Sequence, residues 1–289
     1  MRFRFAARIV TALGLVVAAS PSRAQIARVF VSVNGNDANV CSGIGTPCRT
    51  LNGAITQVDA QGEVIVIDSG SYAGANITKS VKINVAPGVI AFSGLQITAN
   101  PGAGGTVVLR GLTMKAATPG SGTGIAHTSG NLFIESTVVD GWGIGVTTNA
   151  GTRVYLKDVI VRNNAGIGVN SDAGFVSMDN VRIENNGFGY SAFGTSQVTA
   201  TRSVFSGNTT GVNVSGPTAA INLHQCQIAS NTKGVTASAS GTARVSDSAI
   251  TANGTGLENS SGVIESYANN QLRGNTSAST GTITTVVLQ

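Results

Sequence analysis

The sequence predicts an all-β protein whose chain winds into a parallel β-solenoid of about 22 residues per coil. The main observation is an asparagine that recurs at intervals of 22, 22, 23, 22 and 22 along the chain, at Asn164, Asn186, Asn208, Asn231, Asn253 and Asn275. A fixed period in this range is typical of repeat architectures. Two further observations agree: apolar residues keep a constant distance from each asparagine, and glycine is present in nearly every repeat, which disfavours helix.

The spacing of apolar residues predicts the strands. Positions three, eight and ten residues before each asparagine are apolar in nearly every repeat, and the position nine before is mostly polar. This alternation indicates a half-buried strand. In the last repeat Glu265 interrupts the column ten residues before the asparagine. The repeat is shorter than a strand–helix–strand unit of about 30 residues and accommodates three short strands and three turns.

Asparagine suits a turn column in such a coil for two reasons. It tolerates left-handed backbone, and its amide can pair with the amides of the coils above and below. The apolar and asparagine columns resemble those of the right-handed parallel β-helix of the pectin lyase-like superfamily, which includes pectate lyases and polygalacturonases. The resemblance covers most of the chain after residue 24 and implies the right-handed fold. It implies little about activity, because function depends on a site carried by the coils.

The N-terminus, residues 1–24, has the features of a secretory signal peptide. Arg2, Arg4 and Arg8 precede an apolar stretch over residues 9–19 that is too short to span a bilayer. Small residues place cleavage after Ala24, and the alternative is cleavage after Ala19. We therefore expect export to the periplasm, the cell envelope or the medium, with residues 25–289 forming one β-helix domain.

Export changes the charge of the protein. Cleavage after Ala24 removes the four arginines of residues 1–24. It leaves 18 − 4 = 14 basic residues against 13 acidic ones, a net charge near +1. This value supports neither nucleic acid nor an anionic polymer as a partner. No later segment reaches about 18 uninterrupted apolar residues, so we expect no membrane span after signal cleavage.

Residues 25–62 form an N-terminal segment before the coils. It starts with a strand over residues 29–33, followed by Cys41 and Cys48 in a loop. In an exported chain these cysteines are expected to form a disulfide, and a metal site is the alternative. Residues 50–60 show helical periodicity, with Gly62 expected to end the helix. Such a helix would cover the open end of the solenoid. Residues 46–51, 62–66 and 70–72 resemble the start of a group of secreted bacterial β-helix proteins.

The rest of the chain is predicted to be coils of increasing regularity. Irregular coils occupy residues 64–114, and residues 116–124 form a Gly-rich excursion. Regular coils run over residues 132–278, and residues 282–288 form a terminal strand.

Charged residues recur with the same period. Glu135, Lys157 and Asp179 alternate in sign at a spacing of 22, as do Asp140, Arg162 and Glu184. On stacked coils each set would form a ladder of opposite charges that neutralise one another, and each such pair contributes roughly 0.2–1 kcal/mol.

The same region is the candidate functional face. Phe133 and Tyr155 stack beside the first charge ladder and could bind a sugar chain. Glu135 and Asp179, two coils apart, are the candidate carboxylates for glycoside cleavage, but Lys157 between them would favour two ionised groups, whereas an acid catalyst must carry a proton.

Other candidate sites are weaker. The catalytic patterns of the resembled family are absent, since His127 does not lie in a Gly-His-Gly sequence and the carboxylates do not form a calcium cluster. Cys226 is interpreted as a small core residue. The alternative, a nucleophile, would need a histidine partner; His224 lies two residues away on the same strand, the residue between them faces the other way, and no third member of a catalytic triad is evident.

These observations favour a non-catalytic secreted or envelope protein that presents a rigid face to a glycan or a surface partner. The alternative is a polysaccharide lyase or glycoside hydrolase acting on the face between Phe133 and Glu184. A scaffold or adhesin without a small ligand is the third interpretation. We expect no cofactor, no metal and no nucleic acid, and the oligomeric state stays open.

Overall fold

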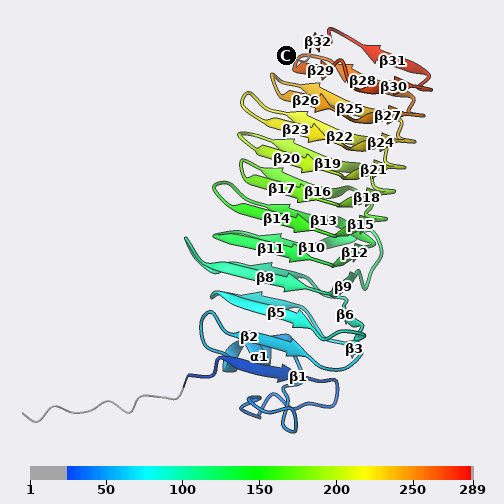
Figure 1. Ribbon diagram of the computed structural model, residues 1–289. Helices are drawn as coiled ribbons and strands as arrows, with labels where there is room; N and C mark the ends of the chain where they lie inside the picture. Colours follow the sequence, from blue (N-terminus) through cyan, green and yellow to red (C-terminus); the bar gives the residue numbers. More distant parts are fainter. Residues whose placement is uncertain (1–24, 288–289) are drawn as a thin grey trace, which may run out of the picture.

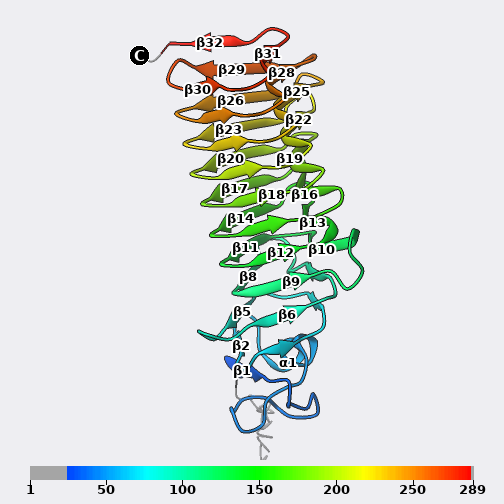
Figure 2. The ribbon, with the colours of Figure 1, turned by 90° about the vertical axis from the view of Figure 1, so that its right-hand side faces the viewer.

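The computed structural model describes residues 25–287, which form a single stack of coils built almost entirely from parallel strands (Figures 1 and 2). The signal peptide predicted over residues 1–24 lies outside the described residues. Each full coil contributes one strand to each of three sheets, and every strand pairs in parallel with its counterpart in the next coil. The prediction of a parallel β-helix is confirmed, and corresponding positions such as Asn164 and Asn186 lie 22 residues apart on successive coils.

Sheet 1 has 12 strands. They are β1 (Arg28–Val31), β2 (Glu63–Val66), β5 (Val81–Val85), β8 (Thr106–Arg110), β11 (Asn131–Glu135), β14 (Arg153–Lys157), β17 (Phe175–Asp179), β20 (Gln197–Thr201), β23 (Ala220–His224), β26 (Thr242–Ser246), β29 (Val263–Tyr267) and β32 (Thr284–Val286).

Sheets 2 and 3 have 10 strands each. Sheet 2 comprises β3 (Gly70–Ser71), β6 (Ala91–Ser93), β9 (Leu112–Lys115), β12 (Val138–Asp140), β15 (Ile160–Arg162), β18 (Arg182–Glu184), β21 (Val204–Ser206), β24 (Gln227–Ala229), β27 (Ala249–Thr251) and β30 (Gln271–Arg273). Sheet 3 comprises β4 (Ala75–Ile77), β7 (Ile97–Ala99), β10 (Ser121–His127), β13 (Trp142–Thr148), β16 (Ile167–Asp172), β19 (Phe188–Phe193), β22 (Thr210–Ser215), β25 (Lys233–Ser238), β28 (Thr255–Asn259) and β31 (Ser277–Thr280).

The core runs along the axis as columns of inward side chains. One column of sheet 1 contains residues that are all nearly inaccessible to solvent: Leu132, Val154, Val176, Val198, Ile221, Ala243 and Ile264. The predicted interruption of this column by Glu265 is wrong. Ala243 pairs with Ile264, so this coil is one residue shorter before β29, and Glu265 faces outward beside Arg244.

The one longer interval between ladder asparagines has a local cause. Asn208 and Asn231 lie 23 residues apart. The loop between β22 and β23 covers residues 216–219, whereas the equivalent loop between β19 and β20 covers residues 194–196. The extra residue therefore lies outside the strands, and the strand register of both neighbouring coils is unchanged. The insertion is tolerated because this loop, between sheets 3 and 1, lies outside both the strand ladders and the asparagine column.

The corners depend on left-handed backbone, but not at the predicted position. The ladder asparagines do not have positive φ; the residues directly before them do, namely Asn163, Asn185, Gly207, Ser230, Ala252 and Gly274. A second series of left-handed residues turns the chain between sheets 1 and 2: Gly111, Ser136, Asp158, Asn180, Arg202, Gln225 and Asp247. The expectation that the recurring asparagine itself adopts left-handed backbone is thus wrong by one residue.

Close packing requires the glycine that lies three residues after most ladder asparagines. A Cβ at Gly189 would lie 2.5 Å from the carbonyl oxygen of Gly211 and 2.9 Å from Nδ2 of Asn208. Any larger residue would push against the backbone of the next coil and against the asparagine ladder at once. The recurring glycine is therefore a consequence of the ladder.

The N-terminal end of the stack is covered by a helix. Helix α1 (Leu51–Gln57) starts at Thr50, whose hydroxyl accepts a hydrogen bond from the Gly53 N–H, and packs against β1, β2 and β4. The Asn52 side chain accepts from the backbone N–H of Asn76 at 2.9 Å, which pairs one backbone donor at the free edge of sheet 3. The predicted helix is confirmed, but it ends at Gln57, where Val58 becomes extended, and Gly62 does not end it.

The cysteine loop covers the edge of sheet 1. Cys41 and Cys48 form the predicted disulfide. Within this loop the carbonyl oxygens of Cys41 and Cys48 accept hydrogen bonds from Phe30 and Ser32 at 2.8 and 2.9 Å. The backbone groups of β1 that would otherwise be unpaired are thus satisfied.

Two boundaries differ from the sequence prediction. The Gly-rich excursion predicted over residues 116–124 is shorter, because β10 already begins at Ser121. The predicted terminal strand corresponds to β32, which pairs with β29.

No helix among residues 25–287 has the length and apolar character needed to cross a membrane.

Candidate functional site

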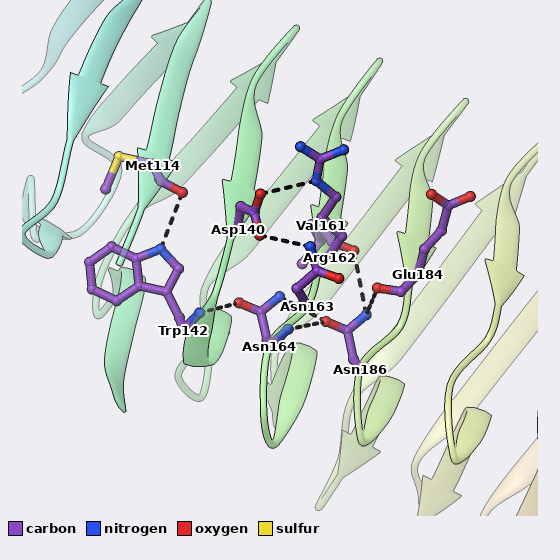
Figure 3. Close-up of polar contacts among 9 residues, drawn as sticks. All are labelled: Met114, Asp140, Trp142, Val161, Arg162, Asn163, Asn164, Glu184 and Asn186. Carbon is purple, nitrogen blue, oxygen red and sulfur yellow. Dashed lines mark hydrogen bonds and ion pairs between the residues drawn. The ribbon is translucent and has the colours of Figure 1, made fainter. Parts of the chain in front are cut away.

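The recurring asparagines lie at the corner between sheets 2 and 3, where all but the partly buried Asn275 are buried. From Asn186 onward, Oδ1 of each asparagine accepts two hydrogen bonds from the asparagine of the preceding coil, one from its backbone N–H and one from its amide. For Asn164 bonding to Asn186 these distances are 2.9 and 2.8 Å (Figure 3). The same pair of bonds continues through the remaining members to Asn275. Nearly all the polar atoms of these buried amides are paired, which gives them a structural role.

Trp142 occupies the ladder position one coil before Asn164. Its backbone N–H donates to Oδ1 of Asn164 at 2.9 Å, and its indole Nε1 donates to the carbonyl oxygen of Met114 at 3.2 Å (Figure 3). The side chain is 5 % exposed. The indole therefore ends the amide column by bonding to backbone, and it is not part of a surface.

The first charge ladder is arranged differently from the prediction. Glu135, Lys157 and Asp179 are in register on adjacent strands of sheet 1. However, Glu135 pairs with Arg110 at 2.5 Å and Asp179 pairs with Arg202, one coil beyond it. Within residues 25–287, Lys157 has no carboxylate within 4.0 Å. The predicted pairing through Lys157 is wrong, because the longer arginine side chains of neighbouring coils take both carboxylates.

The second ladder is half formed. Asp140 pairs with Arg162 at 3.1 Å (Figure 3), whereas Glu184 pairs with Arg182 on its own strand at 2.5 Å. The predicted pair between Arg162 and Glu184 is absent from the ion pairs of the described chain. Asn163 also donates to Asp140 at 2.9 Å, so the left-handed corner residue contributes to the same cluster.

Aromatic side chains lie on the outward face of sheet 1. The rings of Phe133 and Tyr155 are stacked along the axis, with centroids 4.5 Å apart and planes 10° apart. The guanidinium of Arg153 lies 4.5 Å from the centroid of the Phe175 ring, which is 43 % exposed. A stacked pair of rings and a cation over a neighbouring ring form an ordered, partly exposed surface.

A hollow lies on each side of the stacked rings. The first, of about 320 Å³, is lined by Phe133 and by polar side chains of the earlier coils: Glu63, Lys82, Asn84, Arg110 and Glu135. The second, of about 210 Å³, lies beside Tyr155 and is lined by Arg153, Phe175, Ser177, Gln197 and Thr199 among others. Val108 and Ser177 are the register neighbours of the two rings, and their small size leaves an outer face of each ring uncovered.

Three cations of this face form no ion pair with a carboxylate of the described chain. Lys82, Arg153 and Lys157 form no ion pair within residues 25–287, whereas Glu63, Glu135 and Asp179 are each paired with an arginine. In the first hollow, Oδ1 of Asn84 is buried and has no hydrogen-bond partner among residues 25–287. The hollow therefore offers the exposed cation of Lys82 to a ligand, whereas the buried oxygen of Asn84 is not accessible to one.

Sequence reasoning found the aromatic pair and missed the arginines and Lys82. Arg110 and Lys82 belong to the irregular coils, where the asparagine period gives no register. Extending the apolar columns of sheet 1 backward from Leu132 through Val107 to Val81 would have placed Lys82 and Arg110 on the same face.

Cys226 is buried and unpaired, as predicted. Burial raises the pKa of its thiol to about 11, so the thiol is not ionised near neutral pH. The ring of His224 lies outside the core, with Nδ1 3.1 Å from the Ser246 hydroxyl. The two side chains therefore do not form a nucleophile and base.

His127 is the other histidine, and it lies inside the coil. It is fully buried, with Nδ1 3.5 Å from the Thr148 hydroxyl, which lies in turn 2.5 Å from the Thr152 hydroxyl. Burial lowers the pKa of the imidazole below its ordinary value. Because its strand, β10, belongs to sheet 3 and its ring points into the core, His127 is not placed to act as a base on the outward face of sheet 1.

The fold and the columns define a right-handed β-helix protein. A family model described as "Right handed beta helix region" matches residues 121–277, more than half of the sequence, and the chain belongs to that family. No curated protein sequence matches the chain.

Solved structures share the fold. A structure of XylC with xylose has a TM-score of 0.64 at 8% identity, covering 84% of this chain and 70% of that chain. A pectate lyase, Pel9A, has a TM-score of 0.58 at 14% identity, covering 85% of this chain and 70% of that chain. At these identities the similarity establishes the fold alone, and it agrees with the pectin lyase-like resemblance.

Proposed function

We propose that the protein is exported and binds an extended anionic polysaccharide along the outward face of sheet 1 without cleaving it. The observation that carries this proposal is a group of cations without ion pairs in the described chain, Lys82, Arg153 and Lys157, beside the exposed edge of the Phe133–Tyr155 stack.

The aromatic residues support a sugar ligand. The apolar face of a sugar ring packs favourably on an aromatic ring. Tyr155 and Phe133 each leave one ring face toward a hollow, and the hollow beside Tyr155 is bordered by Ser177, Gln197 and Thr199, which can exchange hydrogen bonds with sugar hydroxyls. Because the two hollows follow one another along the axis, a single extended chain would lie over both.

The charges favour an anionic chain. Among the described residues of this face, the three cations form no ion pair, and Glu63, Glu135 and Asp179 already have arginine partners. The net charge near +1 of residues 25–289 concealed this local excess, because the carboxylates of other coils offset it in the total. Local potential, and not net charge, attracts a charged ligand to a face.

The carboxylate geometry argues against cleavage. Oε2 of Glu135 accepts from Nε and Nη2 of Arg110 at 2.7 and 2.5 Å, and Asp179 is held by Arg202 on the opposite side. The two arginines draw the carboxylates in opposite directions along the axis, and the hollow that contains Glu135 does not include Asp179. Glycoside hydrolysis needs two carboxyl groups that converge on one bond.

The disulfide supports export. A Cys41–Cys48 bridge persists in oxidising compartments such as the periplasm or the medium. Together with the sequence features of residues 1–24, it favours a protein that meets polysaccharide outside the cytoplasm.

Calorimetric titration with an oligomer of uronic acids, and with an uncharged oligosaccharide of the same length, tests the proposal. We expect binding of the charged oligomer, weakened at high salt, and a loss of about three- to tenfold in affinity for Lys157→Gln and for Tyr155→Ser. Lys115→Gln, an exposed cation on sheet 2 without an ion pair among the described residues, is the matched control and should bind like the parent. Equal loss in Lys115→Gln, or no binding of the charged oligomer, would refute the proposal.

A further inference from the structure

A third hollow lies away from the face described above, at the corner between sheets 1 and 2. Its volume is about 240 Å³, and it spans the three coils that contain β24, β27 and β30. Gln227, Ala249 and Gln271 are in register on these strands. The hollow exists because the middle strand carries a methyl group where both neighbours carry a long amide side chain.

The rim of this hollow is unusually rich in amides. Gln225, Gln227, Asn269 and Gln271 line it together with Asp247, while Ala249, Cys226 and Ser248 complete the lining. The positions equivalent to Gln227 in the earlier coils of sheet 2 are Val138, Ile160, Arg182 and Val204, none of them an amide. Amide side chains at this position of sheet 2 are therefore confined to the last coils.

The rim residues are partly preordered and partly free. Gln225 donates to Oδ2 of Asp247 at 3.2 Å, and Oδ1 of Asn269 accepts from the Asp247 backbone N–H at 3.0 Å. The side-chain amides of Gln227 and Gln271 form no hydrogen bond with any residue that the structure describes. Each free amide offers donors and an acceptor, so both walls of the hollow can exchange hydrogen bonds with a ligand.

We propose that this hollow binds one residue of an uncharged, hydroxyl-rich ligand, a neutral sugar. Its two amide walls are about two strand spacings apart, roughly 10 Å between Cα atoms, which leaves room for a single ring between them. The methyl group of Ala249 provides an apolar floor, and the amides and the Asp247 carboxylate bond to hydroxyl groups at the rim.

The chemistry separates this site from sheet 1. Among the described residues no cation lines the corner hollow, and Asp247 would repel an anion. The hollow is also smaller than the roughly 300–1,000 Å³ of ordinary small-molecule pockets, which agrees with a single sugar unit of a longer chain. The corner site therefore selects neutral sugars, and its existence does not depend on the proposed binding of anionic polysaccharide.

The test is saturation-transfer NMR with uncharged hexasaccharides of glucose and of N-acetylglucosamine, followed by titration of the one that binds. Gln271→Ala should weaken binding about three- to tenfold, because it removes one wall. Ala249→Gln should abolish binding, because it fills the hollow while adding an amide. Ala220→Gln, the same change on the outward face of sheet 1, is the matched control and should leave binding unchanged.

The outcomes separate the alternatives. Circular dichroism and thermal unfolding establish that each variant keeps the β-helix. Unchanged or stronger binding by Ala249→Gln would mean that amides on the surface suffice, and would overturn the site. Absence of binding to both hexasaccharides, or equal loss in Ala220→Gln, would overturn it as well. None of these results depends on whether sheet 1 binds uronic acids.

Discussion

Asn208→Leu tests how much the asparagine ladder stabilises the coils. Asn208 lies in the middle of the column and is 2 % exposed. Its Oδ1 accepts from the backbone N–H and the amide of Asn186 at 2.9 and 3.0 Å, and its Nδ2 donates to Asn231 at 3.2 Å and to the carbonyl of Ile183 at 3.0 Å. Leucine has nearly the same size and replaces none of these four bonds.

The magnitude follows from that count. Four buried hydrogen bonds at about 0.5–1.5 kcal/mol each give a loss of roughly 2–6 kcal/mol, and the Asn186 N–H is left without a partner inside the core. For a chain of this size, such a loss lowers the melting temperature by roughly 4–11 °C. Urea denaturation followed by far-ultraviolet circular dichroism measures the change.

Asn222→Leu is the matched control. Asn222 is exposed on sheet 1, and its side chain forms no hydrogen bond within the described chain. The substitution should therefore change the free energy of unfolding of the protein by less than about 0.5 kcal/mol. If Asn208→Leu unfolds at the same urea concentration as the parent and the control, the reasoning from buried amides is refuted.

Three other predictions follow from particular contacts. Thiol labelling of unfolded, unreduced protein should modify one cysteine, Cys226, and modification of three would disprove the Cys41–Cys48 bridge. Burial lowers the pKa of His127 in the folded protein, so the unfolded chain takes up more protons below pH 6.5 and stability should fall as the pH drops through that value. His127→Gln should lose less stability than the parent between about pH 7.5 and pH 5 in urea denaturation, and an identical loss would contradict the assignment. Gly189→Ala should destabilise the protein, because its Cβ would lie 2.5 Å from the Gly211 carbonyl oxygen; an unchanged melting temperature would argue against that packing.

The fold was largely predictable because its signals are local and repeated. Three apolar columns and one asparagine column define the period, and each coil confirms the register of the next. Departures from the 22-residue period have local causes that a single period does not predict. A strict 22-residue period places Glu265 in the core column. In the structure the corner before β29 is one residue shorter and the corner before β30 is one residue longer, so Ile264 occupies that position.

The candidate site was less predictable, because side-chain reach decides it. Register alone placed Lys157 between Glu135 and Asp179, and the structure keeps that register. The ion pairs nevertheless go to Arg110 and Arg202, which lie one coil further out. Arg110 belongs to a coil without a ladder asparagine, and Arg202 occupies a left-handed corner whose direction the sequence pattern does not reveal.

Binding without cleavage is the central claim, and prolonged incubation with polymeric uronic acid tests it most directly. The protein is incubated with the polymer, with and without calcium, and three quantities are read: protein retained on the polymer, absorbance from unsaturated ends, and new reducing ends. The account predicts retention of the protein and a polymer of unchanged length. New chain ends that disappear in Asp179→Asn would contradict it and would make the outward face of sheet 1 an active site.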